Sequence, residues 1–135
     1  MFKKTIKYTD FNGTSREEDY YFHMSVPEVA RMEAKLGGMS LPDYAKQLQA
    51  DQDADLIIQF MENIILTAYG KKSSDGKNFL KGPKIREEFE YSQAYAELFE
   101  ELILSEEKAG AFAEGVAMQT RKMKATGEDY LQPVE

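Results

Sequence analysis

An alternating pattern of apolar residues over the first 24 positions constrains the fold most strongly. Apolar side chains recur at even positions on both sides of the dipeptide Asn12-Gly13, which predicts two strands joined as a β-hairpin over residues 2–24. All of these apolar residues stand at even positions: Phe2, Ile6, Tyr8, Tyr20, Phe22 and Met24. We therefore expect one face of the hairpin to pack on the rest of the chain.

The parity of these residues also predicts the loop. A two-residue loop would pair even positions with odd ones and divide the apolar residues between two faces. A three-residue loop over residues 11–13 avoids this, with Asp10 opening the turn and Gly13 left-handed in a G1 bulge. This register places Phe2 near Phe22 and leaves the odd-numbered side chains and the strand edges free.

Helix-start signals and 3.6-residue periodicity predict about five helices after the hairpin. Ser25 and Glu28 form a capping box, and Pro83 is suited to the first position of a helix. The helix expected to follow Pro83 carries two apolar stripes, which indicates two packing partners. The helices are expected at about residues 26–36, 41–50, 54–69, 84–104 and 106–118, with a loop over residues 71–82.

The predicted fold class is mainly α (α+β), with the N-terminal β-hairpin followed by these helices in one domain. This domain covers residues 1–118, a length that can bury a substantial hydrophobic core. Residues 119–135 lose periodicity and contain Gly127 and Pro133, so we expect a flexible C-terminal tail there.

Composition excludes several classes of function. The chain has no cysteine and no signal-peptide pattern, and its longest nearly apolar run, residues 56–66, is too short to span a membrane. These features are typical of a cytoplasmic protein without a membrane partner. The net charge of −7 argues against nucleic-acid binding, which requires Lys and Arg to neutralise phosphates.

Patterns that suggest catalysis, cofactor binding or metal binding are incomplete. His23 has no nearby residue at ligand spacing. Residues 70–78 do not match a phosphate-binding P-loop. Their glycine spacing differs from the motif, no hydroxyl residue follows Lys77, and the segment follows a helix. Three glutamates share one face of the fourth helix, but such a run is usually a solvated surface. We expect no catalytic, cofactor or metal site.

Two segments are candidates for protein binding. The loop over residues 71–82 is basic in an acidic chain, so it is either a solvated loop or a docking site for an acidic partner. The second apolar stripe of the fourth helix is either core or a patch for another subunit or a client. With the outward-facing positions of the second strand, the candidate residues are Tyr91, Tyr95, Leu98, Lys71, Lys72, Lys77, Tyr21 and His23.

Five segments together resemble the tail assembly chaperones of long, non-contractile-tailed phages that infect Gram-positive bacteria. The segments are residues 8–13, 16–22, 64–70, 74–77 and 94–99, and the resemblance spans about residues 2–118. It implies a non-enzymatic protein of the host cell cytoplasm that binds the tape measure protein and is absent from the mature virion. It also implies association in several copies and recruitment of tail-tube protein. The alternatives are a structural tail or tail-joint protein retained in the virion, and an acidic inhibitor that mimics DNA.

Overall fold

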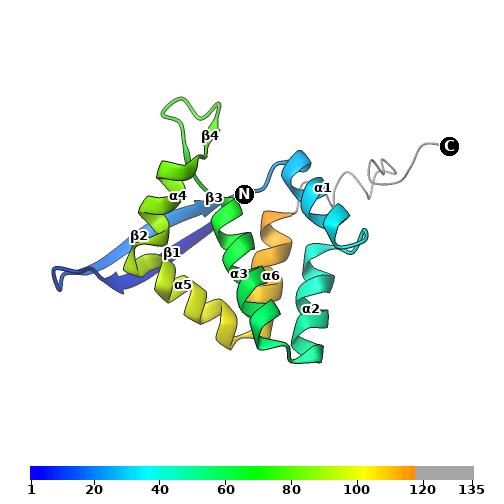
Figure 1. Ribbon diagram of the computed structural model, residues 1–135. Coiled ribbons are helices and arrows are strands. Elements are labelled where there is room, and N and C mark those ends of the chain that lie inside the picture. The colour runs from blue at the N-terminus through cyan, green and yellow to red at the C-terminus, as the bar shows by residue number, and fades with distance from the viewer. Residues whose placement is uncertain (118–135) are drawn as a thin grey trace.

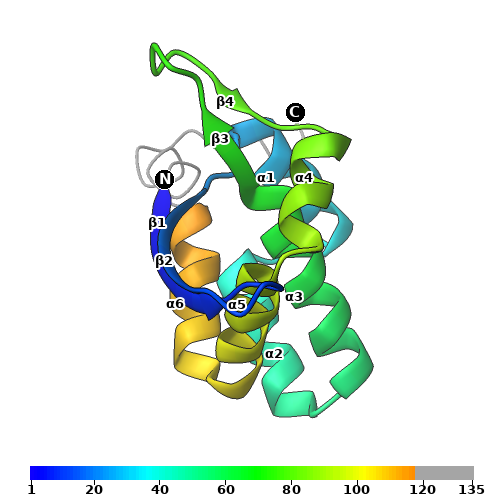
Figure 2. The ribbon, with the colours of Figure 1, turned by 90° about the vertical axis from the view of Figure 1, so that its left-hand side faces the viewer.

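The computed structural model describes residues 1–117, which form an α+β domain with one antiparallel sheet and six helices (Figures 1 and 2). The strands, in sheet order, are β1 (Phe2–Thr9), β2 (Ser15–Phe22), β3 (Tyr69–Lys72) and β4 (Phe79–Leu80). The helices are α1 (Val26–Lys35), α2 (Leu41–Asp51), α3 (Ala54–Ala68), α4 (Pro83–Glu90), α5 (Gln93–Leu104) and α6 (Glu106–Val116). The predicted mainly α (α+β) fold is thus confirmed. The tail expected over residues 119–135, and the last residue of the helix expected to end at 118, lie outside the described residues.

The N-terminal hairpin has the predicted register. Phe2 pairs with Phe22, and the two strands end at the pair Thr9 and Ser15. Gly13 has a φ of 83°, in the left-handed region that a G1 bulge requires. The Asp10 carboxylate accepts hydrogen bonds from backbone N–H groups within the loop at 2.9 Å, so this side chain holds the loop closed.

The even-numbered face of the hairpin packs on the helices, as the parity of its residues predicts. Phe22 is fully buried and lies edge-on to Phe89 of α4 and to Phe112 of α6. Phe2 also meets Phe112 edge-on, with ring centroids 5.1 Å apart. The sheet is therefore joined to α4 and α6 through one aromatic cluster.

The helix expected over residues 84–104 is two helices, so this prediction is wrong. The helix is interrupted at Tyr91 and Ser92. The Ser92 hydroxyl accepts a hydrogen bond from the Tyr95 N–H at 3.3 Å, as the N-cap of α5. The same hydroxyl donates to the carbonyl oxygen of Phe89 at 2.6 Å. Ser92 thus serves the last turn of α4 and the first turn of α5, which stabilises the break.

The segment expected as a loop over residues 71–82 contains strand residues. α3 ends at Ala68, and the chain continues directly into β3, which pairs with β4 in a projecting hairpin (Figure 1). β3 also pairs with β2 through Tyr21 and Phe22. A Cβ added to Gly70 would lie 2.5 Å from the Phe79 ring, so only glycine fits this close approach. The expectation that both edges of the N-terminal hairpin are free is therefore wrong at the end of β2.

Candidate protein-binding groove

The predicted binding residues fall into different environments. Tyr91 is 72% exposed at the break between α4 and α5. Tyr95 is half-buried, and its hydroxyl is buried without a hydrogen-bond partner among residues 1–117. Leu98 is 1% exposed and packs in the core, which corrects its assignment to a binding patch. Of the stripe of Tyr91, Tyr95 and Leu98, only Tyr91 is fully exposed at the surface.

The candidates on the strands lie closer together. Lys72 of β3 places its ammonium 4.4 Å from the centre of the Tyr21 ring on β2. His23 lies edge-on to Phe79 of β4, and burial, with the charges of the N-terminus and Lys81, lowers its pKa. The side chain of Lys77 is exposed between β3 and β4 and forms no ion pair within residues 1–117.

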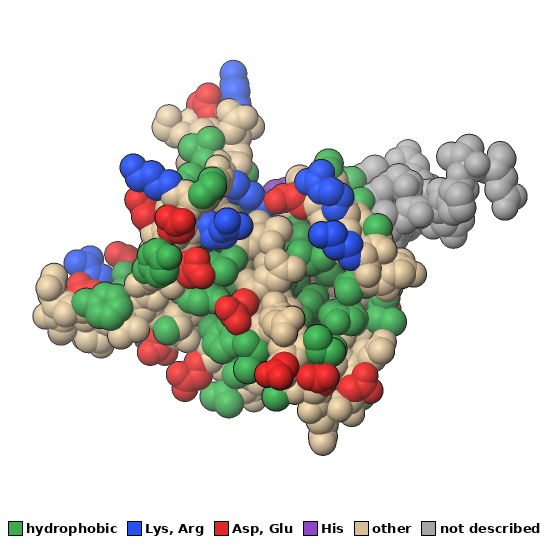
Figure 3. Space-filling view, viewed as in Figure 1, with side chains coloured by type: hydrophobic (Ala, Val, Ile, Leu, Met, Phe, Trp, Pro, Cys, Tyr) green, Lys and Arg blue, Asp and Glu red, His purple; other side chains and the backbone are tan. Residues whose placement is uncertain are grey.

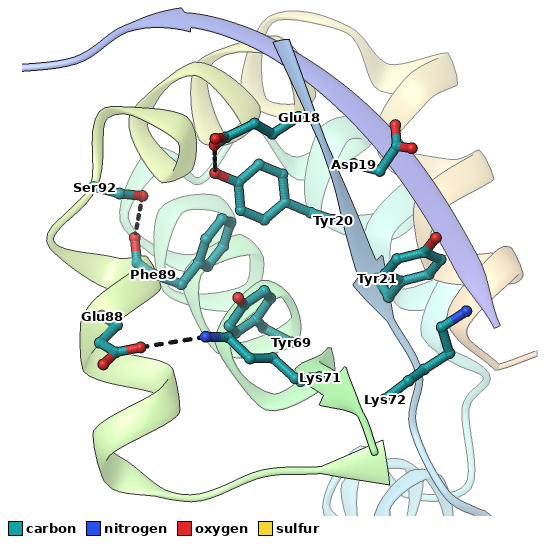
Figure 4. Close-up of a pocket in the computed structure, with 11 residues that line it drawn as sticks. Glu18, Asp19, Tyr20, Tyr21, Tyr69, Lys71, Lys72, Glu88, Phe89 and Ser92 are labelled. Atoms are coloured by element: carbon teal, nitrogen blue, oxygen red, sulfur yellow. Dashed lines mark hydrogen bonds and ion pairs between the residues drawn. The ribbon is translucent and has the colours of Figure 1, made fainter. Parts of the chain in front are cut away.

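A groove of about 610 Å³ opens between β2 and β3 on one side and α4 and the start of α5 on the other (Figure 4). It is here called the β2–α4 groove. Three of the predicted residues, Tyr21, Lys71 and Lys72, line it. The complete lining is Glu18, Asp19, Tyr20, Tyr21, Tyr69, Gly70, Lys71, Lys72, Glu88, Phe89 and Ser92.

Aromatic side chains form the inner part of this groove. Tyr69 and Phe89 stack with ring centroids 4.2 Å apart and an interplanar angle of 15°, and Tyr20 contacts both rings. The Tyr20 hydroxyl donates to the Glu18 carboxylate at 2.9 Å. Burial and the hydrogen bonds of this hydroxyl raise the pKa of Tyr20, so the ring presents a neutral surface at physiological pH. Phe89 and Tyr69 are buried at 2% and 7% exposure, so the half-buried Tyr20 is the ring of this cluster that remains accessible.

Charged side chains line the outer part. The β2 wall carries the acidic residues Glu18 and Asp19, and the α4 wall carries Glu88. The lysines that line the groove, Lys71 and Lys72, both belong to β3. Lys71 reaches Glu88 across the groove at 3.4 Å, with both side chains more than half exposed. Such an exposed ion pair contributes only about 0–1 kcal/mol and is readily exchanged for a partner's charge.

The edge of β2 that faces this groove has free backbone groups. The Asp10 N–H donates to the Thr14 carbonyl at 2.9 Å, so even-numbered positions exchange hydrogen bonds between β1 and β2. The N–H and C=O groups of Glu17 and Asp19 therefore point away from β1. β3 pairs with β2 only at Tyr21 and Phe22, so no described strand pairs with Glu17 or Asp19 on that side.

Lys81 is not part of the groove, although the sequence places it among the basic loop residues. Its ammonium donates to both Glu28 carboxylate oxygens, at 2.7 and 2.9 Å, and to the Thr67 carbonyl oxygen at 2.8 Å. It therefore joins the β3–β4 segment to the start of α1 and the end of α3.

The charged side chains are unevenly distributed on the surface. In the view of Figure 3, Lys and Arg gather around the β3–β4 hairpin and the neighbouring helices, whereas the charged residues along the lower border are acidic. Within residues 1–117 there is no cluster of three or more His, Cys, Asp or Glu side chains that could hold a metal ion. In the same range no helix has the length and apolar character needed to cross a membrane.

Sequence reasoning missed the aromatic part of the groove. Tyr20 was expected on the packed face of the hairpin, and Phe89 lies in the helix that was expected over residues 84–104. Both assignments are consistent with their burial, but neither indicates that a groove lies beside these rings. The missed signal is Ser92, whose capping chemistry marks the break that separates α4 from α5 next to β2.

The sequence has a match among known protein families. The family described as phage tail assembly chaperone matches residues 1–128, nearly the whole chain. No curated protein and no solved structure matches the chain. The family suggests a non-enzymatic role, with protein partners, during tail assembly in the host cell. Because the match covers far more than half of its length, the chain belongs to the phage tail assembly chaperone family.

Proposed function

We propose that this protein binds the tape measure protein during tail morphogenesis, keeps it soluble, and helps to recruit tail-tube subunits. A tape measure protein is a long helical chain with apolar faces that aggregates before the tube covers it. A chaperone for such a client needs an exposed apolar surface, reversible contacts and no chemical step.

The observation that supports this proposal is the exposed Tyr91 ring at the α4–α5 break. Tyr91 is 72% exposed immediately beside Ser92, which lines the β2–α4 groove, and the half-buried Tyr20 ring also lines this groove. Tyrosine binds apolar surfaces at a low cost in side-chain entropy, which suits reversible recognition. Lys71 and Lys72 add positive charge at one end of the groove, where acidic residues of a client can dock.

Coexpression with the tape measure protein of the same phage tests the proposal. The expected result is a soluble complex that copurifies, with the tape measure protein insoluble when expressed alone. Tyr91→Ala should reduce the amount of complex recovered, whereas Leu104→Ala, at an equally exposed residue at the far end of α5, should not. If the proteins never copurify, and the tape measure protein is equally insoluble with and without the chaperone, the proposal is wrong.

Two further parts of the proposal concern assembly. The chain is expected to self-associate around its client and to leave before the tail is complete. Sedimentation of the purified protein, alone and with the client, measures the number of copies. Mass spectrometry of purified virions should not detect the chain. A stoichiometric amount there would instead identify a structural tail protein.

A further inference from the structure

We propose that the β3–β4 hairpin of one copy of this chain docks in a groove between α2 and α6 of a second copy. The inference names the two surfaces for the self-association in the proposed function, and it rests on that part of the function alone. It involves neither the client nor the β2–α4 groove.

The β3–β4 hairpin projects from the body of the domain (Figures 1 and 2). Its loop is held closed, because the Asp75 carboxylate accepts hydrogen bonds from the Ser73 hydroxyl at 2.7 Å and from the Lys77 N–H at 3.0 Å. Lys77 is exposed in this loop, and Leu80 of β4 is 44% exposed. The hairpin therefore presents a positive charge and an apolar side chain on a preorganised backbone, which lowers the entropy cost of docking.

The second surface is a groove of about 600 Å³ between α2 and α6, here called the α2–α6 groove. Small and apolar residues form most of its floor, and charged residues form its rim. The complete lining is Pro42, Ala45, Lys46, Gln49, Glu106, Glu107, Ala109, Gly110, Ala111 and Glu114.

Gly110 is the residue of this groove that the packing of the domain does not explain. A glycine inside a helix is destabilising relative to alanine. A Cβ added to Gly110 would meet nothing within 4 Å, so no packing among residues 1–117 requires a glycine there. Gly115 of the same helix differs, because its Cβ would lie 2.4 Å from the Phe2 ring. Close approach of a partner to α6 accounts for Gly110.

The charges of the two surfaces are opposite. The β3–β4 hairpin carries three exposed lysines and one aspartate, whereas the rim of the α2–α6 groove carries three exposed glutamates and Lys46. Within residues 1–117, none of these glutamates forms an ion pair, and neither does Lys77. The charges on both sides of the proposed contact are thus available to a partner, and opposite charges speed and orient such an encounter.

The two surfaces of one molecule are too far apart to meet. The β3–β4 hairpin and the first turn of α6 lie at opposite ends of the domain in both Figure 1 and Figure 2. The contact therefore forms between copies. Because it joins two different surfaces of the same chain, it is heterologous and can repeat from copy to copy as a ring or a helix.

Charge reversal on each surface tests the interface. The hairpin variant combines Ser74→Glu with Lys77→Glu, and the groove variant combines Glu107→Lys with Glu114→Lys. All four side chains are exposed, and the two groove substitutions lie at opposite ends of α6, so their effects on the helix dipole oppose each other. In sedimentation velocity at low salt, the wild type should self-associate, and each variant should associate at least about tenfold more weakly.

An equimolar mixture of the two variants distinguishes this interface from a general effect of charge. Each variant alone brings like charges together, whereas the hairpin of either variant is complementary to the groove of the other. The mixture should therefore associate at least about tenfold more tightly than either variant alone. A monomeric wild type, or a mixture as weak as the separate variants, would overturn the proposal. Variants that associate as tightly as the wild type would also overturn this interface, but they would leave the proposed self-association and client binding intact.

Gly110→Gln tests the same contact without a change of charge. Glutamine is a better helix former than glycine and the space at this position is open, so the substitution should not lower Tm. The new side chain would fill the floor of the groove, and self-association should weaken at least about tenfold. Ala96→Gln is the matched control, because Ala96 is exposed on α5 outside the groove and its replacement should leave association unchanged. Equal association of the two variants would contradict the proposed docking.

Discussion

Lys81 joins three elements of the fold, and replacing it with Met should cost about 2 kcal/mol of stability. The Lys81 and Glu28 side chains are 24% and 22% exposed, so the pair lies between a surface ion pair and a buried one. Exposed pairs contribute about 0–1 kcal/mol, whereas breaking a buried pair costs about 3–5 kcal/mol. The ammonium also donates to the Thr67 carbonyl oxygen in the last turn of α3, where carbonyl groups lack helix partners and a positive charge is favourable.

Urea unfolding followed by far-UV circular dichroism measures this change. For a chain of this length, a loss of about 2 kcal/mol corresponds to a decrease in Tm of roughly 6–10 °C. A double-mutant cycle with Glu28→Gln separates the ion pair from the contact with Thr67, and we expect a coupling of about 1–2 kcal/mol. Lys77→Met is the matched control, because this lysine is exposed in the same β3–β4 segment and should change stability by less than about 0.5 kcal/mol.

The pH dependence gives an independent check on the same pair. Burial alone would raise the pKa of Glu28, but hydrogen bonds from Lys81 and from the Ser25 N–H outweigh it and leave the pKa below its ordinary value. A carboxyl group with a lowered pKa stabilises the fold at neutral pH, and the contribution is lost as the pH falls through the folded-state pKa. The difference between wild type and Lys81→Met should therefore shrink below about pH 4. A Lys81→Met change smaller than about 0.5 kcal/mol at neutral pH, or zero coupling in the cycle, would refute the reasoning.

Three further predictions concern the helices. Tyr95→Phe should raise stability by up to about 1 kcal/mol in urea unfolding. Burial raises the pKa of this phenol to about 12, and its hydroxyl has no hydrogen-bond partner within residues 1–117. A clear loss of stability would reveal a partner for the hydroxyl in solution. Leu98→Ala should lower the free energy of unfolding by about 2–5 kcal/mol, because it leaves a cavity in the core, whereas Tyr91→Ala should change it by less than about 0.5 kcal/mol. Equal effects of the two substitutions would contradict the burial of Leu98. Gly115→Ala should cost about 1–3 kcal/mol, since its new Cβ would lie 2.4 Å from the Phe2 ring, and an unchanged Tm would show that this ring moves aside freely.

The elements that sequence predicted well are those defined by neighbouring residues. The register of the N-terminal hairpin follows from the parity of its apolar positions, and Gly13 supplies the one left-handed residue that this loop needs. The start of α1 follows from the capping box of Ser25 and Glu28, where both reciprocal hydrogen bonds form. In each case the determining residues lie within a few positions of one another.

The break between α4 and α5 was also encoded locally, but a second signal concealed it. Apolar residues continue at helical spacing from Ile85 to Leu102, which favours one long helix. Ser92 supports a break only if its hydroxyl caps a new helix, and periodicity cannot distinguish a capping serine from a solvent-facing one. Packing decides between one long helix and two shorter ones, since Phe89 stacks on Tyr69 while Leu98 enters the core beside α3.

The groove could not be predicted from sequence, because it depends on contacts between distant segments. It exists where β3 leaves β2 after two paired residues, and that pairing joins positions almost fifty residues apart. In the sequence Lys71, Lys72, Lys77 and Lys81 are equivalent members of one basic loop, yet the structure gives each a different environment. Lys71 crosses the groove to Glu88, Lys72 covers a tyrosine ring, and Lys81 has its charge satisfied within the fold. Of these four lysines, only Lys77 has neither an ion pair nor a ring contact within residues 1–117, so charge reversal at Lys77 and at Lys81 should separate loss of binding from loss of stability.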